Sequence, residues 1–76
     1  MNLEVFKEDL NKIGHTQYQE DGNVCIVCQI QTAHLEEILL RNVLKRFGEY
    51  QITDTEDFDD DEVKFKTNLP WKLAHV

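Results

Sequence analysis

The chain has 76 residues, of which 41% are hydrophobic and 30% are charged, and its 15 acidic and 8 basic side chains give a net charge of −7. This length predicts a single domain over residues 1–76 with a small core, and the composition is that of a folded globule. The low basic content excludes a protein that binds nucleic acid directly by neutralising phosphates.

Membrane and secretory segments are not expected. The longest apolar run extends from Val24 to Cys28, whereas a membrane-spanning helix needs roughly 20 apolar residues. The segment from Met1 to Glu4 lacks the charged and apolar regions of a signal peptide. We therefore expect a cytoplasmic protein without membrane partners, in which both cysteines are reduced thiols.

The first half of the chain predicts a helix followed by a β-hairpin. The helix lies between Asn2, a suitable N-cap, and Gly14, where a helix can end. Asp21-Gly22 favours a type I′ turn between two strands within residues 15–32. The apolar positions of the helix recur at spacings of three and four and are Leu3, Phe6, Leu10 and Ile13.

The second strand of this hairpin, Val24 to Gln31, is apolar on both faces at first, which is typical of a central strand. In the predicted register Tyr18 faces Cys25 and Thr16 faces Val27. The face expected to contact the core consists of Val24, Ile26, Cys28 and Ile30. The opposite face carries Cys25, Val27, Gln29 and Gln31.

The C-x-x-C spacing of Cys25 and Cys28 lies inside this predicted strand. Residues three apart in a strand point to opposite faces and lie about 10 Å apart, so the two thiols cannot share a metal or form a disulfide without a bend. The three histidines, His15, His34 and His75, have no helical ligand spacing. We therefore expect no metal, no cofactor and no catalytic residues, and two buried cysteines.

The second half of the chain predicts another helix and two more strands. Thr32 is the expected N-cap of a helix from Ala33 to Phe47, which ends at Gly48. Alternating patterns predict strands over residues 49–53 and 62–67, and Pro70 makes the tail extended or turn-like. The expected core stripe of the helix is Leu35, Leu39, Leu40, Val43 and Phe47.

These elements follow the order αββαββ. They predict an α+β fold with a four-stranded, mainly antiparallel sheet and both helices packed on one face. The alternative is a three-stranded sheet with a loose tail.

A run of acidic residues carries the entire net charge. Without its seven acids, the remaining eight acids balance the eight bases. The run is expected to be the connection between the third and fourth strands, with Phe58 in its middle. Its acids are Asp54, Glu56, Asp57, Asp59, Asp60, Asp61 and Glu62.

Three interpretations of this run stay open: a solvated loop, a divalent cation site and a docking surface for a basic partner. The EF-hand pattern fails because the required glycine and flanking helices are absent. A docking surface fits a basic protein surface, such as that of a nucleic-acid-binding protein, with Phe58 as an anchor. Small acidic inhibitors that bacteriophages direct at host nucleases, CRISPR complexes or polymerases have this general charge character.

An alternative function uses a different surface. The face that carries Tyr18 and Val27 lacks an obvious covering helix, and Trp71 is of a type enriched at interfaces. Either the C-terminal tail covers this face or another chain does, with a homodimer as the simplest case. The protein would then be a small structural subunit, and a solvent-facing patch of Tyr18, Val27 and Trp71 would favour that alternative.

Overall fold

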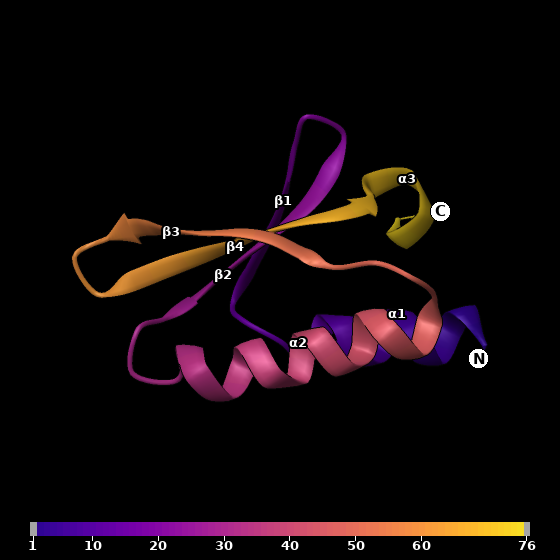
Figure 1. Cartoon of the computed structure of the whole chain (residues 1–76), viewed down its shortest axis with the longest axis horizontal. Helices are drawn as coiled ribbons and strands as arrows, with labels where there is room; N and C mark the ends of the chain where they lie inside the picture. The colour runs from indigo at the N-terminus through magenta and orange to yellow at the C-terminus, as the bar shows by residue number, and fades with distance from the viewer. Residues whose placement is uncertain (1, 76) are drawn as a thin grey trace.

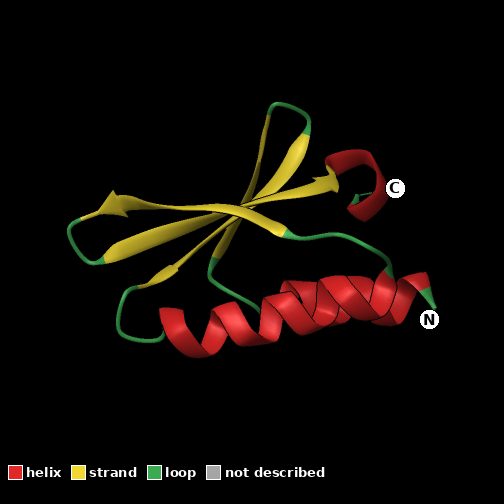
Figure 2. Cartoon of the chain, in the orientation of Figure 1, coloured by secondary structure: helices red, strands yellow, loops and turns green. Residues whose placement is uncertain are grey.

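The computed structural model describes residues 2–75 and confirms the α+β fold, with one further short helix at the C-terminus. The four strands form an antiparallel sheet in the order β1-β2-β4-β3, and α1 and α2 lie side by side on one side of it (Figures 1 and 2). No helix among residues 2–75 is long and apolar enough to cross a membrane. The elements are α1 (Leu3–Asn11), β1 (Thr16–Glu20), β2 (Asn23–Gln29), α2 (Ala33–Phe47), β3 (Ile52–Asp59), β4 (Glu62–Pro70) and α3 (Trp71–Ala74).

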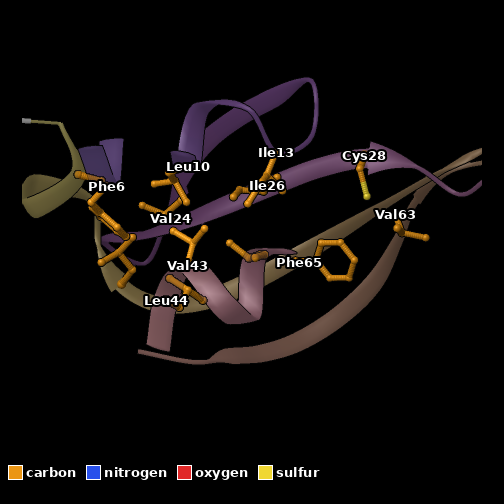
Figure 3. Packing of buried hydrophobic residues seen from close by; sticks show 13 residues of the cluster. Phe6, Leu10, Ile13, Val24, Ile26, Cys28, Val43, Leu44, Val63 and Phe65 are labelled. Carbon is orange, nitrogen blue, oxygen red and sulfur yellow. The ribbon is translucent and has the colours of Figure 1, made fainter. Parts of the chain in front are cut away.

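The core lies between the sheet and the two long helices. Phe6 of α1 stacks on Phe47 of α2 with ring centroids 4.0 Å apart. The N-terminus of α1 is capped as predicted, because the Asn2 side chain accepts a hydrogen bond from the Glu4 N–H at 2.7 Å. Buried side chains from both helices and from β2 and β4 meet in one cluster (Figure 3), among them Leu10, Val24, Ile26, Cys28, Leu40, Val43, Leu44 and Phe65.

The predicted core stripe of α2 is wrong at its N-terminal end. Leu35 and Leu39 are 60% and 45% exposed. The Glu36 carboxylate instead accepts a hydrogen bond from the Gly14 N–H at 2.8 Å, which turns Glu36 toward the core side. Thr32 is the N-cap residue of α2, as predicted, and its carbonyl accepts a hydrogen bond from the Glu36 N–H at 3.0 Å, although its side chain makes no cap bond.

The first hairpin has the predicted register, with Tyr18 opposite Cys25. Its turn has positive φ at Asp21 and Gly22, as a type I′ turn requires. The core face of β2 is shorter than predicted, because the strand ends at Gln29 and Ile30 is 51% exposed.

The second hairpin differs most from the prediction. Most of the acidic run lies within β3 rather than in a connecting loop, and only Asp60 and Asp61 form the turn. The physical reason is the pairing of β3 with β4, which places Glu56 opposite Lys64. The ion pairs of Glu56 with Lys64 and Lys66 offset part of the low β-propensity of the acids.

The C-terminal tail is also more ordered than predicted. β4 continues to Pro70 and pairs with both β2 and β3, which excludes the three-stranded alternative. The following residues, expected to be extended or turn-like, form α3. Ala74 of α3 is buried and joins the core cluster.

Candidate functional site

The sheet face turned away from α1 and α2, here called the outer face, is closed by the curvature of the sheet. Cys25 and Val27 lie on this face and are only 1% and 0% exposed. Tyr18 of β1 and Phe58 of β3 belong to opposite edge strands, yet their ring centroids are 6.2 Å apart. The strongly twisted strands cross one another in Figure 1, so the two edges approach each other over the outer face.

Four charged side chains complete this cover. Lys64 and Lys66 lie opposite Val27 and Cys25 in the neighbouring strand, where their aliphatic stems can cover apolar surface. The Lys64 Nζ is 3.0 Å from a Glu20 carboxylate oxygen and 3.6 Å from Glu56, and the Lys66 Nζ is 3.2 Å and 3.8 Å from the same two carboxylates. The outer face is therefore covered by its own strands rather than by the C-terminal tail.

This network changes the protonation behaviour of its members. Hydrogen bonds from Lys64 and then Lys66 hold the pKa of the Glu20 carboxyl below its ordinary value of 4.5. Donation to Glu20 raises the pKa of Lys64 and of Lys66. Both directions favour the charged forms, which is the expected result of close opposite charges.

The substitution Glu20→Gln is expected to destabilise the protein at neutral pH. It leaves two ammonium groups side by side with Glu56 as their remaining carboxylate. Because the folded-state pKa of Glu20 is depressed, its stabilisation is present above 4.5 and is lost as the pH falls through the lower folded-state value. Urea unfolding at pH 7 and at about pH 3 should show a larger stability difference between wild type and variant at pH 7 than at pH 3. A difference that is equal at both pH values would contradict this role of Glu20.

The seven acids of the run divide into two groups. Glu56 pairs with Lys64 and Lys66 on the outer face, and the Glu62 carboxylate pairs with His15 Nε2. The others are exposed and have no ion pair among residues 2–75. These five free carboxylates are Asp54, Asp57, Asp59, Asp60 and Asp61, and four of them lie in residues 57–61, here called the hairpin tip.

The hairpin tip is held in place by the rest of the fold. The Ile30 N–H donates to the Asp61 carbonyl at 2.8 Å, which joins the tip to the β2–α2 connection. Within the tip, the Asp59 carboxylate accepts a hydrogen bond from the Asp60 N–H at 2.7 Å. The His15–Glu62 pair anchors the start of β4. The free carboxylates are therefore presented on a fixed turn rather than on a long loop.

A hollow of about 570 Å³ lies beside the hairpin tip. The tip and the β2–α2 connection occur at the same end of the molecule (Figure 1), and both contribute to the walls. The lining residues are Ile30, Asp57, Phe58, Asp59 and Asp60. Phe58 and Ile30 are each 51% exposed, so this polar region also contains two large, half-exposed apolar side chains.

Ile30 is the member of this region that sequence reasoning missed. The alternating pattern of β2 continues through Ile30 and placed it in the core. Gln29 and Gln31 keep the alternation of a half-buried strand, so no local signal shows that β2 already ends at Gln29.

A cation site would have to use the turn. Carboxylate oxygens of Asp59, Asp61 and Glu62 lie within 4.8 Å of one another. Three carboxylates are fewer ligands than the six to eight oxygens of a typical Ca²⁺ site, and Glu62 is already paired with His15. This arrangement is better explained by the turn geometry than by a dedicated metal centre.

The two cysteines lie on opposite faces of β2, as predicted. Cys28 belongs to the core cluster, whereas the Cys25 Sγ lies on the outer face, 3.9 Å from Glu20. Burial raises the pKa of both thiols, to about 12 for Cys28. Neither sulfur is thereby held as a reactive thiolate.

The predicted secondary interface of Tyr18, Val27 and Trp71 does not form an exposed surface patch. Val27 is fully buried, and Tyr18 is half-buried beside Phe58. Trp71 packs against the core cluster, stacks on His75 with centroids 3.7 Å apart, and donates its backbone N–H to the Gly22 carbonyl at 2.8 Å. The three residues therefore do not form the solvent-facing patch that would favour a structural subunit.

Exposed apolar surface lies on α2 instead. Its first half carries Leu35, Ile38 and Leu39, which are 60%, 45% and 45% exposed. The C-terminal end of α2 contacts α1, where Arg46 pairs with Asp9 and Phe47 stacks on Phe6. The exposed apolar side chains therefore lie toward the end of α2 that is away from these contacts.

Together these features define a small α+β domain with a presented acidic hairpin. Comparison of the chain with protein-family models, with curated proteins and with solved structures gave no match. The following proposals therefore depend on the geometry and electrostatics of the site.

Proposed function

We propose that the protein is a small, non-catalytic binding protein that docks its acidic segment, residues 54–62, onto a basic surface of another protein. The observation that carries this proposal is the group of five free carboxylates on a fixed hairpin, beside the half-exposed Phe58 and Ile30. Charge steers a partner of opposite sign, and apolar contacts add affinity once the charges have met.

The distribution of the acids favours a compact basic patch as the partner surface. In β3, alternate side chains point to opposite faces, so the seven carboxylates do not form one continuous row. Asp54 and Glu56 share the outer face with Lys66 and Lys64, whereas the free charge is concentrated at residues 57–61. A phosphate-binding patch on a nucleic-acid-binding protein has the required sign and density.

The most concrete form of this proposal is a cytoplasmic inhibitor that competes with nucleic acid for such a patch, as phage-type or anti-CRISPR-like proteins do. A non-catalytic role is supported by the cysteines, since both have a raised pKa and lie on opposite faces of β2. A structural subunit ranks second. Its predicted surface has no exposed centre, and it would have to use the α2 face of Leu35, Ile38 and Leu39.

Binding to purified core histones, used as a basic nucleic-acid-binding probe, tests the proposal. The affinity is expected to fall at least about tenfold between roughly 50 and 200 mM salt, because exposed charge pairs are screened. Added duplex DNA should displace the protein from the histones. Salt-independent binding, or simultaneous binding of DNA and protein to the same histone surface, would contradict the proposal.

A further inference from the structure

Two of the residues that line the hollow beside the hairpin tip are large and apolar, and they come from separate elements. Phe58 comes from the end of β3, and Ile30 comes from the β2–α2 connection. The hydrogen bond from the Ile30 N–H to the Asp61 carbonyl fixes the distance between these elements. The hollow is therefore formed by the fold itself and does not depend on one flexible loop.

The surface of this hollow combines two large apolar side chains with three aspartates. Each of its two large apolar side chains keeps 51% of its surface exposed. Removal of this apolar surface from water is favourable, so an occupant that covers the two side chains gains free energy. Asp57, Asp59 and Asp60 line the same hollow, which favours an occupant that is positively charged as well as partly apolar.

We propose that the hollow binds an arginine side chain of the basic partner, an inference that rests on the proposed docking function. A guanidinium is planar and weakly hydrated, so it can lie against the Phe58 ring while its forked N–H groups donate to neighbouring carboxylates. The aliphatic part of the side chain would pack on Ile30. A lysine ammonium is a compact, strongly hydrated charge, and it satisfies the carboxylates without covering the ring equally well.

Two peptides of equal charge, octa-arginine and octa-lysine, test this inference by fluorescence anisotropy at one salt concentration. Wild-type protein is expected to bind octa-arginine about 3- to 10-fold more tightly, the range that a cation–π contact at a partly exposed site provides. Phe58→Leu keeps an apolar side chain but removes the aromatic face, and it should bring this ratio close to one. Leu35→Ala, which trims an exposed apolar side chain on α2, is the matched control and should retain the preference.

Equal affinities of the wild type for the two peptides, or an unchanged preference in Phe58→Leu, would overturn the arginine inference. The docking function would still stand if replacing the aspartates of the hairpin tip with asparagine lowered the affinity for both peptides equally. If neither peptide bound, both proposals would fail. Ile30→Ser provides a second variant, independent of the Tyr18–Phe58 contact, and it should also reduce the preference for arginine.

Discussion

Replacing Asp59, Asp60 and Asp61 with asparagine is expected to weaken binding to a basic protein about 10- to 100-fold at low ionic strength. Each exposed charge pair contributes up to about 1 kcal/mol, and the three substitutions remove three of the five free carboxylates. The loss should shrink as salt is added, because screening already weakens the wild-type interaction. Titration of core histones with wild-type and triple-variant protein measures both effects.

The triple variant should keep the fold. All three side chains are exposed, and asparagine at position 59 retains an oxygen that can accept the hydrogen bond from residue 60. A matched control removes three exposed acids elsewhere, by Glu4→Gln, Glu8→Gln and Glu49→Gln, and has the same net charge as the triple variant. The control should bind nearly as the wild type does. Equal losses in the two triple variants would show that total charge, and not the hairpin tip, determines binding.

The substitution Gly14→Ala is expected to have the largest effect on stability, a loss of about 2–5 kcal/mol in the free energy of unfolding. Gly14 has a φ of +69°, which L-residues with a side chain rarely adopt. An added Cβ would also lie 2.6 Å from the Val27 carbonyl oxygen and 2.5 Å from Ile26 Cγ2. The backbone of β2 would have to move, at a point where it is fully buried.

Gly22→Ala is the matched control for this effect. Gly22 has a similar φ of +80°, but an added Cβ would meet no atom within 4 Å. Only backbone strain remains, so the free energy of unfolding is expected to fall by about 1–2 kcal/mol. Urea unfolding of the two variants separates the strain from the steric conflict, and equal losses would contradict the close approach of Gly14 to β2.

Local patterns in the sequence are sufficient to predict most of the fold. The spacing of Phe6 and Leu10 predicts α1, and Asp21-Gly22 predicts a turn that sets the register of the first hairpin. The same approach fails for α2, where helical periodicity alone does not show that Glu36, through its bond to Gly14, faces the sheet side while Leu35 faces solvent.

The candidate site is predictable only in part. Its charge and the presence of Phe58 are visible in the sequence, but acids are poor strand formers, so the extent of β3 depends on pairing with Lys64 and Lys66 that local patterns do not show. The cover over Val27 depends on the twist of the whole sheet, which brings Tyr18 close to Phe58. The role of Ile30 likewise depends on where β2 ends, and strand ends are the least predictable part of such patterns.

The claim that the hairpin tip engages a basic surface is tested most directly by residue-resolved NMR during titration with a basic protein. The predicted result is a set of amide chemical-shift changes confined to Ile30 and residues 57–61. These changes should all saturate at the same ratio of partner to protein, and added salt should reverse them. Amides on the exposed face of α2, such as those of Leu35 and Ile38, should be unaffected. Shift changes centred on α2, with the hairpin tip unchanged, would contradict the account.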